Sequence, residues 1–283
     1  MTKRVGRTRD SDKAEDKTTG SGERLLSVLA MFTLDRPEWT VDDAAAELAV
    51  SATTAYRYFK QLTKAGLISP VSGASYTLGP AIIQMDRQIQ ISDPMLTAAR
   101  PVMADLVQYA AEGATVLLCR LFHDRVMCVH QVMGRGPQEP VSYERGRLMP
   151  LFRGATSKII LAHLPARTLK SLFAHDAAEI SRARLGRTFD EFRRTLAGLR
   201  RAGACVSRSE IDPRRVGVAA PIFDRDRAIL GSLSFALPEA RADERLIGRL
   251  VPLTIAGARE IERGMSAGPA KNVASPARVK IAR

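Results

Sequence analysis

Residues 51–65 (SATTAYRYFKQLTKA) are the segment that most restricts what this chain can fold into. Ser51 is a residue type that commonly caps a helix N-terminus, and Gly66 stands where a helix commonly ends. Between them, three apolar residues recur at helical spacing on one face: Ala55, Phe59 and Leu62. The segment is therefore predicted to be an amphipathic helix, and its apolar face needs a scaffold to cover it.

Two shorter helices are predicted immediately before this segment. The first covers residues 23–32, with Ser21 as a possible cap. Its apolar positions are Leu25, Leu26, Val28, Leu29 and Phe32. Thr40, followed three residues later by Asp43, resembles a capping box that opens the second helix. A tight turn then leads directly into residues 51–65.

A hairpin and a further helix are predicted after the amphipathic segment. Residues 67–68 and 76–78 have the character of two short strands around a turn rich in Ser, Pro and Gly. A helix then starts at Pro80 and is ended by Pro94. Three helices with a tight turn before the third, followed by a hairpin, are typical of a winged helix-turn-helix. The helix at 80–93 is predicted to connect this module to a second domain.

The outward face of residues 51–65 carries hydroxyls, methyl groups and cations. With the cap residue, it consists of Ser51, Ala52, Thr53, Thr54, Tyr56, Arg57 and Lys60. In the major groove of DNA, hydroxyl and guanidinium groups bond base edges and phosphates, and methyl groups contact thymine. Arg57 is the first candidate for such a contact. The alternative is a three-helix module with a solvated face, but such a face commonly mixes charges of both signs.

The charge distribution supports the same face. The chain has a formal net charge of +13, which is typical of nucleic-acid binding, yet residues 23–79 carry five Lys and Arg against six Asp and Glu. Every one of those acids precedes Ser51, whereas Arg57, Lys60 and Lys64 follow it. The sequence therefore predicts a basic stripe on one helix rather than a basic domain.

The second half of the chain alternates between helical and extended patterns. With 283 residues, the chain is long enough for two domains. The predicted elements are a helix to about 111, strands at 114–121 and 125–132, a helix at 154–164, a helix ending near 203, strands near 205, at 216–223 and at 229–235, and a helix at 240–263. Antiparallel strands flanked by helices predict an α+β domain.

Several motifs, in this order, resemble the IclR family of prokaryotic transcription regulators. They are LAVSATTAYRYFKQLTKAGLI with SYTLGP, then GRLMPLFRGATSKIILAHL, LRRAGACVSRSE, VGVAAPIFD and GSLSFALP. The resemblance covers nearly all of residues 21–264. It implies a GAF-like effector-binding domain, dimers or dimers of dimers on palindromic operators in double-stranded DNA, and control by small metabolites, often organic acids.

Domain bounds follow from the patterns and the resemblance together. They are a disordered tail at 1–21, a winged helix-turn-helix at 22–79, a connector helix at 80–93, a GAF-like effector-binding domain at 94–264 and a basic disordered tail at 265–283. The tails are polar and poor in large apolar residues, which favours disorder.

The resemblance also implies where a small-molecule effector binds. The matching positions are Met149, Ala155, Thr156, Ser207, Gly217, Ser234 and Ala236. Ala155 and Thr156 begin a predicted helix, whose free N–H groups favour an anion such as a carboxylate. Where the family commonly has an Asp, a Cys and a second Ser, this chain has Ser207, Gly217 and Ala236. Smaller side chains lining the cavity predict a larger cavity, and hence an effector acid with more than two or three carbons.

Other chemistry is not expected. Cys119, His123, Cys128 and His130 cluster in the sequence, but without the spacing of a closed metal site, so no metal and no cofactor are predicted. The chain lacks a G-x-S-x-G elbow, a P-loop and an H-E-x-x-H motif, so it is not expected to be an enzyme. With no signal peptide and no apolar run long enough to span a bilayer, it is expected in the cytoplasm, without a membrane partner.

Two alternatives to an effector-controlled regulator stay open. In one, the effector pocket is collapsed and the second domain only assembles homo-oligomers, so that DNA binding ignores every metabolite. In the other, the chain is an enzyme with an appended DNA-binding domain. Binding of candidate acids without turnover, or turnover of them, separates these alternatives.

Overall fold

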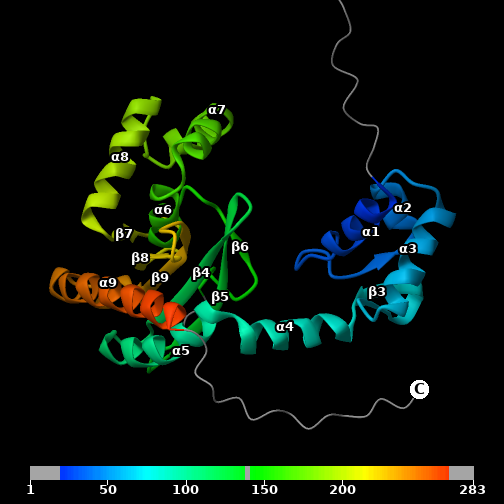
Figure 1. The fold of residues 1–283 in the computed structure, drawn as a ribbon, viewed down its shortest axis with the longest axis horizontal. Coiled ribbons are helices and arrows are strands. Elements are labelled where there is room, and N and C mark those ends of the chain that lie inside the picture. Colours follow the sequence, from blue (N-terminus) through cyan, green and yellow to red (C-terminus); the bar gives the residue numbers. More distant parts are fainter. Residues whose placement is uncertain (1–19, 138–140, 268–283) are drawn as a thin grey trace, which may run out of the picture. The chain divides into compact units, whose positions relative to one another are not determined.

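The computed structural model describes residues 20–137 and 141–267. The chain divides between Ile89 and Gln90 into two compact units, and each unit is described by itself (Figure 1). Most of the two predicted disordered tails, residues 1–19 and 268–283, lies outside the described residues.

The N-terminal unit is a three-helix module with a small antiparallel sheet (Figure 1). Its elements are α1 (Ser21–Ala30), β1 (Trp39–Thr40), α2 (Val41–Glu47), α3 (Ala52–Lys64), β2 (Ile68–Pro70) and β3 (Ser75–Leu78). The strand order is β1-β3-β2, so β1, which was not predicted, extends the expected hairpin by a third strand. The expected cap at Ser21 is wrong, because Ser21 is the first helical residue and Gly20 takes the N-cap position.

Local hydrogen bonds set the starts of α2 and α3 as the sequence predicts. Thr40 Oγ1 accepts a bond from the Asp43 amide at 3.1 Å. Ser51 Oγ accepts one from the Thr54 amide at 3.2 Å. Ala49, with a positive φ of 50°, makes the tight turn between the two helices. These caps satisfy amides that a helix leaves unpaired at its first turn.

One apolar core holds the N-terminal unit together. Its buried members are Val28, Trp39, Ala44, Tyr58, Phe59, Leu62 and Ile68. The ring of Phe59 meets that of Tyr76 edge to face, with centroids 4.9 Å apart. The apolar face of α3 is therefore covered by the first two helices and the sheet, as expected, with Tyr58 as an unpredicted member.

The helix α4 (Pro80–Ser92) covers the predicted connector segment. Asp93 follows it and caps α5 (Pro94–Leu106), because its Oδ1 accepts the amides of Met95 at 2.8 Å and Leu96 at 3.1 Å. Its other carboxylate oxygen forms an ion pair with Arg120. The start of α5 is thus fixed by a side-chain cap as well as by Pro94.

The C-terminal unit is built on a six-stranded antiparallel sheet of order β6-β5-β4-β9-β8-β7. The strands are β4 (Thr115–Phe122), β5 (Arg125–Met133), β6 (Leu148–Met149), β7 (Cys205–Arg208), β8 (Arg215–Phe223) and β9 (Ile229–Pro238). Its helices are α5, α6 (Ala155–Ala162), α7 (Ala166–Arg182), α8 (Phe189–Ala202) and α9 (Glu244–Ser266). The predicted α+β class is confirmed.

Alternate residues of the strands face two separate cores. Val116 and Leu118 pack with α5 and α9 on one face of the sheet. Leu117 and Cys119 pack with α6, α7 and α8 on the other. Figure 1 shows α5 and α9 together on one side and α6 to α8 on the other. At the start of α6, Ala155 bonds Ser207 on β7, and just after its end the ring of His163 meets Phe223 on β8.

Several predicted bounds in the C-terminal unit are wrong. A single helix was expected between 164 and 203, but α7 and α8 are separate helices, and β6 was missed. Only Leu169 and Ile180 of α7 are buried. The last helix begins at Glu244 rather than 240 and continues to Ser266, into the segment expected to be tail.

The helices of the described residues are too short or too polar to span a membrane. None of those in residues 20–137 and 141–267 combines the length and the apolar character that a membrane-spanning helix requires.

Candidate functional site

The surface of α3 opposite the core displays the predicted DNA-contacting side chains. Ser51, Ala52, Thr53, Tyr56, Arg57 and Lys60 are exposed. Thr54 is half-buried, and its hydroxyl lies 2.9 Å from Ser51 Oγ, so these two residues also form the helix cap. The guanidinium carbon of Arg57 lies 5.8 Å from the ring centroid of the buried Tyr58. The structure therefore brings the predicted set onto one solvent-facing surface.

A short turn lies beside this surface in sequence and completes the wing. Residues Ser72–Ala74 form a single 3₁₀ turn between β2 and β3, with Gly73 at a φ of 76°. Glycine adopts this left-handed conformation without the steric cost that a side chain brings. Thr77 Oγ1 donates to the Pro37 carbonyl at 3.2 Å, which ties β3 to the loop before β1.

A small cavity in the C-terminal unit lies at the N-terminal end of α6. Five of the predicted effector positions line it: Ala155, Thr156, Ser207, Gly217 and Ala236. Ser234 lies behind Thr156, with their hydroxyl oxygens 2.9 Å apart. Met149 does not line it, because it pairs with Val126 at the sheet edge and is buried in the core under α6 to α8.

The first amides of α6 already have partners. The Gly154 amide donates to Glu210 Oε2 at 2.9 Å, and the Ala155 amide donates to Ser207 Oγ at 2.9 Å. Glu210 also forms an ion pair with Lys158, 2.5 Å from Oε1 to Nζ. Free N–H groups were expected at Ala155 and Thr156, and the expectation is wrong for Ala155, since a hydroxyl of the protein occupies its amide.

Side chains that the sequence analysis missed close the rest of the cavity. Tyr143 Oη lies 2.9 Å from Ser157 Oγ, and burial raises the pKa of Tyr143, so the phenol is neutral. Asp212 accepts the Ser142 amide at 3.0 Å. The segment VSRSE places Glu210 close to Ser207 in sequence, which was a usable signal, whereas nothing near Tyr143 marked it.

The cavity has a volume of only about 40 Å³. Pockets for small molecules commonly have roughly 300–1,000 Å³. The side chains at Ser207, Gly217 and Ala236 are short, but the cavity that they line is small. Loop residues at 143 and 210–212 line it together with them.

The cysteine and histidine cluster is part of a strand pair. Cys119 and Cys128 face each other across β4 and β5, and both are free and buried. Cys128 Sγ lies 3.4 Å from the His130 carbonyl oxygen. Within residues 20–137 and 141–267, no group of three or more His, Cys, Asp or Glu is arranged to hold a metal ion.

A winged helix with an exposed, hydroxyl-rich and cationic third helix, in one chain with a separate sheet unit that holds a polar cavity, defines a DNA-binding transcription regulator. The family model for the IclR helix-turn-helix domain matches residues 21–72, and that for the bacterial transcriptional regulator IclR C-terminal domain matches residues 91–263. The chain belongs to the IclR family of bacterial transcriptional regulators.

Relatives and solved structures agree with this assignment. The chain is similar to the HTH-type transcriptional regulator KipR of Bacillus subtilis, 23% identical over 243 residues that cover 85% of this chain and 94% of the relative. It is also similar to KdgR of Escherichia coli, 22% identical over 258 residues that cover 90% and 96%.

Among solved structures, a putative IclR regulator from Silicibacter sp. superposes with a TM-score of 0.73 at 23% identity, covering 87% of this chain and 96% of that one. An IclR homolog from Microbacterium hydrocarbonoxydans, complexed with 4-hydroxybenzoate, superposes with a TM-score of 0.71 at 20% identity, covering 88% and 100%.

Proposed function

We propose that this regulator binds a palindromic operator as a homodimer and that a small organic acid, bound at the N-terminal end of α6, changes its affinity for the operator. In this proposal residues 22–79 bind DNA, residues 94–264 bind the effector, and residues 80–93 connect these two domains. The protein acts in the cytoplasm, where the operator lies. The observation that carries the proposal is the exposed polar face of α3, whose apolar face is fully used by the core.

The contacts with DNA are proposed from the exposed residues of α3. Ser51, Ala52, Thr53 and Thr54 stand at the start of the helix, the end that reads base edges in helix-turn-helix proteins. Tyr56, Arg57 and Lys60 follow on the same exposed side. Selection of bound fragments from a random DNA library by the full chain tests the proposal, because it recovers the operator together with its symmetry and half-site spacing. A library that yields no enriched sequence contradicts it.

Replacing Arg57 by Ala is expected to weaken binding to the selected operator by about 1–3 kcal/mol if Arg57 bonds a guanine bidentately. Arg57 is exposed, so the fold stays intact. A titration of labelled operator measures the loss. The matched variant is Arg57→Lys, which keeps the charge and removes the planar fork. Full rescue by Lys assigns Arg57 to a phosphate, and an unchanged titration for both variants removes it from the interface.

A homodimer is supported by an apolar row on α4. Met85 and Ile89 are 50% and 53% exposed, and Ile82, half-buried, lies on the same helix face three residues before Met85. A symmetric dimer interface uses the same patch on both copies, so a row of this kind is self-complementary. Two copies joined there present two α3 helices to two half-sites. A measurement of the mass in solution tests the dimer and also tells a dimer from a pair of dimers.

Effector binding is proposed at the cavity lined by Ala155, Thr156, Ser207, Gly217 and Ala236, with Ser234 behind Thr156. Met149, which was predicted with this set, lies outside the cavity. The hydroxyls of Thr156 and Ser207 and the neutral phenol of Tyr143 can donate hydrogen bonds to an acid. The complex of the Microbacterium homolog with 4-hydroxybenzoate supports an aromatic acid as a probe. Because the cavity is about 40 Å³, any acid requires the loop at 210–212 to move.

Calorimetry with pyruvate, glyoxylate and 4-hydroxybenzoate tests the size of the effector. The short side chains at Ser207, Gly217 and Ala236 lead us to expect that the aromatic acid binds and the two small acids do not. Saturation by pyruvate or glyoxylate, with no heat from the larger acid, contradicts the size prediction. No heat from any acid, with an operator affinity that ignores all of them, favours a domain that only oligomerises.

Replacing Gly217 by Ala is expected to weaken binding of the effector about tenfold, or about 1.4 kcal/mol. The added Cβ lies 3.0 Å from Ser207 Oγ and 3.2 Å from Ala155 Cβ, inside the cavity. Operator binding without effector should be unchanged. Gly248→Ala is the control, because a Cβ there meets nothing within 4 Å. Equal effector binding by both variants would place the effector elsewhere.

We further propose that the chain is not an enzyme. Its relatives are named as transcriptional regulators, and the cavity holds its carboxylates in hydrogen bonds and ion pairs with the protein. Incubation of the purified protein with the same acids should return them unchanged. A product that accumulates in proportion to the amount of protein would establish the enzyme instead.

A further inference from the structure

A second cavity lies at the opposite end of α6 from the effector cavity. It has a volume of about 190 Å³ and lies between the C-terminal end of α6, α8, the end of β8 and α9. α6 has eight residues, which separates its two ends by roughly 12 Å. The two cavities share no lining residue. The second cavity is therefore a separate site and needs its own explanation.

Three guanidinium groups and one carboxylate line this second cavity. The guanidinium groups belong to Arg200 on α8, Arg227 in the turn between β8 and β9, and Arg259 on α9. The carboxylate is Glu262, also on α9. With the imidazole of His163 uncharged, the lining carries an excess of two positive charges. A concave surface of one sign concentrates ions of the opposite sign.

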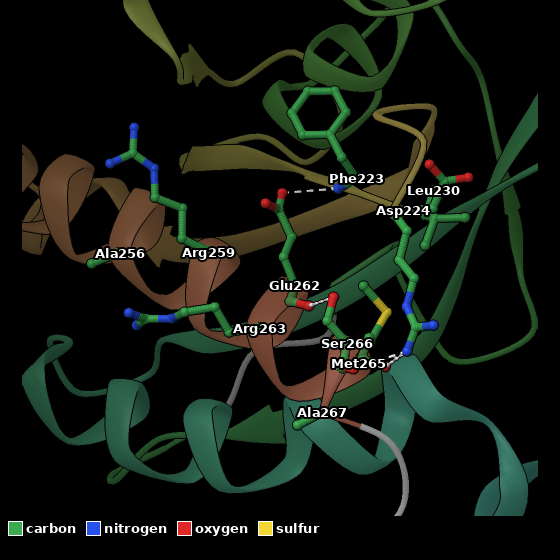
Figure 2. A pocket seen from close by; sticks show the side chains of 11 residues that line it. Phe223, Asp224, Leu230, Ala256, Arg259, Glu262, Arg263, Met265, Ser266 and Ala267 are labelled. Atoms are coloured by element: carbon green, nitrogen blue, oxygen red, sulfur yellow. Dashed lines mark hydrogen bonds between the residues drawn. The ribbon is translucent and has the colours of Figure 1, made fainter.

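The carboxylate is already used by the protein. Glu262 Oε1 accepts the Phe223 amide at 2.9 Å, and Oε2 lies 3.3 Å from the Arg227 guanidinium. Figure 2, which shows the adjoining pocket, displays Glu262 turned toward the backbone of Phe223 and Arg259 on the same helix. Within residues 20–137 and 141–267, Arg259 has no hydrogen-bond or ion-pair partner. Its guanidinium is free to bind a ligand.

The imidazole of His163 supplies a second unused group. His163 lies just after α6, and its ring meets that of Phe223 edge to face at 4.8 Å. Its Nε2 is buried and has no hydrogen-bond partner among the described residues. Burial, followed by the charges of Arg200 and Arg227, lowers the pKa of His163 to about 4, so the ring is neutral near pH 7. A buried polar atom without a protein partner is disfavoured unless a water or a ligand satisfies it.

We propose that this cavity binds a small oxyanion with two negative charges, a phosphate or a short dicarboxylate, as a ligand site distinct from the effector cavity. Arg259 and Arg227 bind the oxygens through their guanidinium forks, which match this geometry. His163, in the tautomer protonated at Nε2, donates a third bond. Arg200 contributes charge while its Nη1 stays on the Ala162 carbonyl at 2.6 Å.

Calorimetric titration of the full chain tests the site, with inorganic phosphate and succinate as probes and chloride at matched ionic strength as the reference. At least one probe should saturate at one site per chain. The probe that saturates shows whether the site binds a phosphate or a dicarboxylate. Arg259→Gln should weaken that binding at least tenfold. Arg245→Gln removes the same charge from an exposed position near the start of α9 and should leave binding unchanged. No saturation by either probe, or equal losses in both variants, overturns the proposal.

Nuclear magnetic resonance of the histidine rings gives a readout that does not depend on binding heats. The chain has four histidines, and the His163→Gln variant assigns the signal of interest. A bound dianion favours the imidazolium, so the saturating probe should raise the pKa of His163 in the wild type and much less in Arg259→Gln. A His163 pKa that ignores the bound probe also overturns the proposal.

Discussion

Replacing Phe59 by Ala should lower the free energy of unfolding of the N-terminal unit by about 3–5 kcal/mol, and operator binding should be lost with it. Phe59 is only 1% exposed and stacks edge to face on Tyr76 at 4.9 Å. Removing the ring leaves a cavity in a core of few large side chains, which cannot close over it. Since a small domain is stable by only a few kcal/mol, the unit should be largely unfolded.

Trp39 makes this loss measurable in the full chain. It is the single tryptophan of the sequence, and it is buried in the N-terminal unit. Its fluorescence in a urea titration therefore reports the unfolding of that unit alone, while circular dichroism also follows the C-terminal unit. The Trp39 transition should move to much lower urea, and the C-terminal transition should stay in place.

The matched control is Tyr56→Ala on the same helix. Tyr56 is 58% exposed, so its removal should change the free energy of unfolding by no more than about 0.5 kcal/mol. Any loss of operator binding in this control then reports a contact with DNA rather than a loss of fold. If Phe59→Ala left the Trp39 transition where it is in the wild type, the orientation of α3 described above would be wrong.

The double variant Met85→Asp/Ile89→Asp should dissociate the proposed dimer and weaken operator binding by roughly 10²–10⁴-fold, because the second half-site would no longer benefit from a tethered partner. The two side chains share one exposed face of α4. Two aspartates there place like charges opposite each other across a symmetric contact. Sedimentation velocity measures the mass, and a titration of the full operator measures the affinity.

Gln84→Asp/Arg87→Gln is the control for charge, since it makes the same change of two units on the other side of α4. It should remain dimeric. A Met85→Asp/Ile89→Asp variant that stays dimeric would show that the interface lies elsewhere, and a wild-type chain that sediments as a monomer would remove the dimer from the proposal.

The helix ends and faces of the N-terminal unit could be predicted because they depend on short-range physics. Ser51 and Thr40 cap helices through bonds to amides three residues away, so neighbouring residues contain the whole interaction. The period of Ala55, Phe59 and Leu62 marks the buried side of α3 by itself. β1 was missed because its two residues are a strand only through their pairing with β3, more than thirty residues later.

The effector cavity was predictable in place but not in shape. The resemblance to the family located Ala155, Ser207 and Gly217 around one cavity. It did not predict that Tyr143 and Glu210 also line this cavity. Both residues lie in loops, which have no hydrophobic periodicity and no capping residue to identify them. Volume depends on how segments distant in sequence fill the same space, so side-chain sizes at three positions did not predict the volume of about 40 Å³.

The sequence by itself determined the class of the protein, the two-domain order and the outward face of α3, because capping, periodicity and ordered motifs act within a few residues of each other. Only the tertiary structure decided the filled state of the effector cavity and the meeting of His163, Arg227 and Arg259 at a second one. Those groups come from the end of one helix, a turn and another helix, which lie far apart in the chain. Their charges act on one another only because the packing of α6, α8 and α9 on the sheet brings them together.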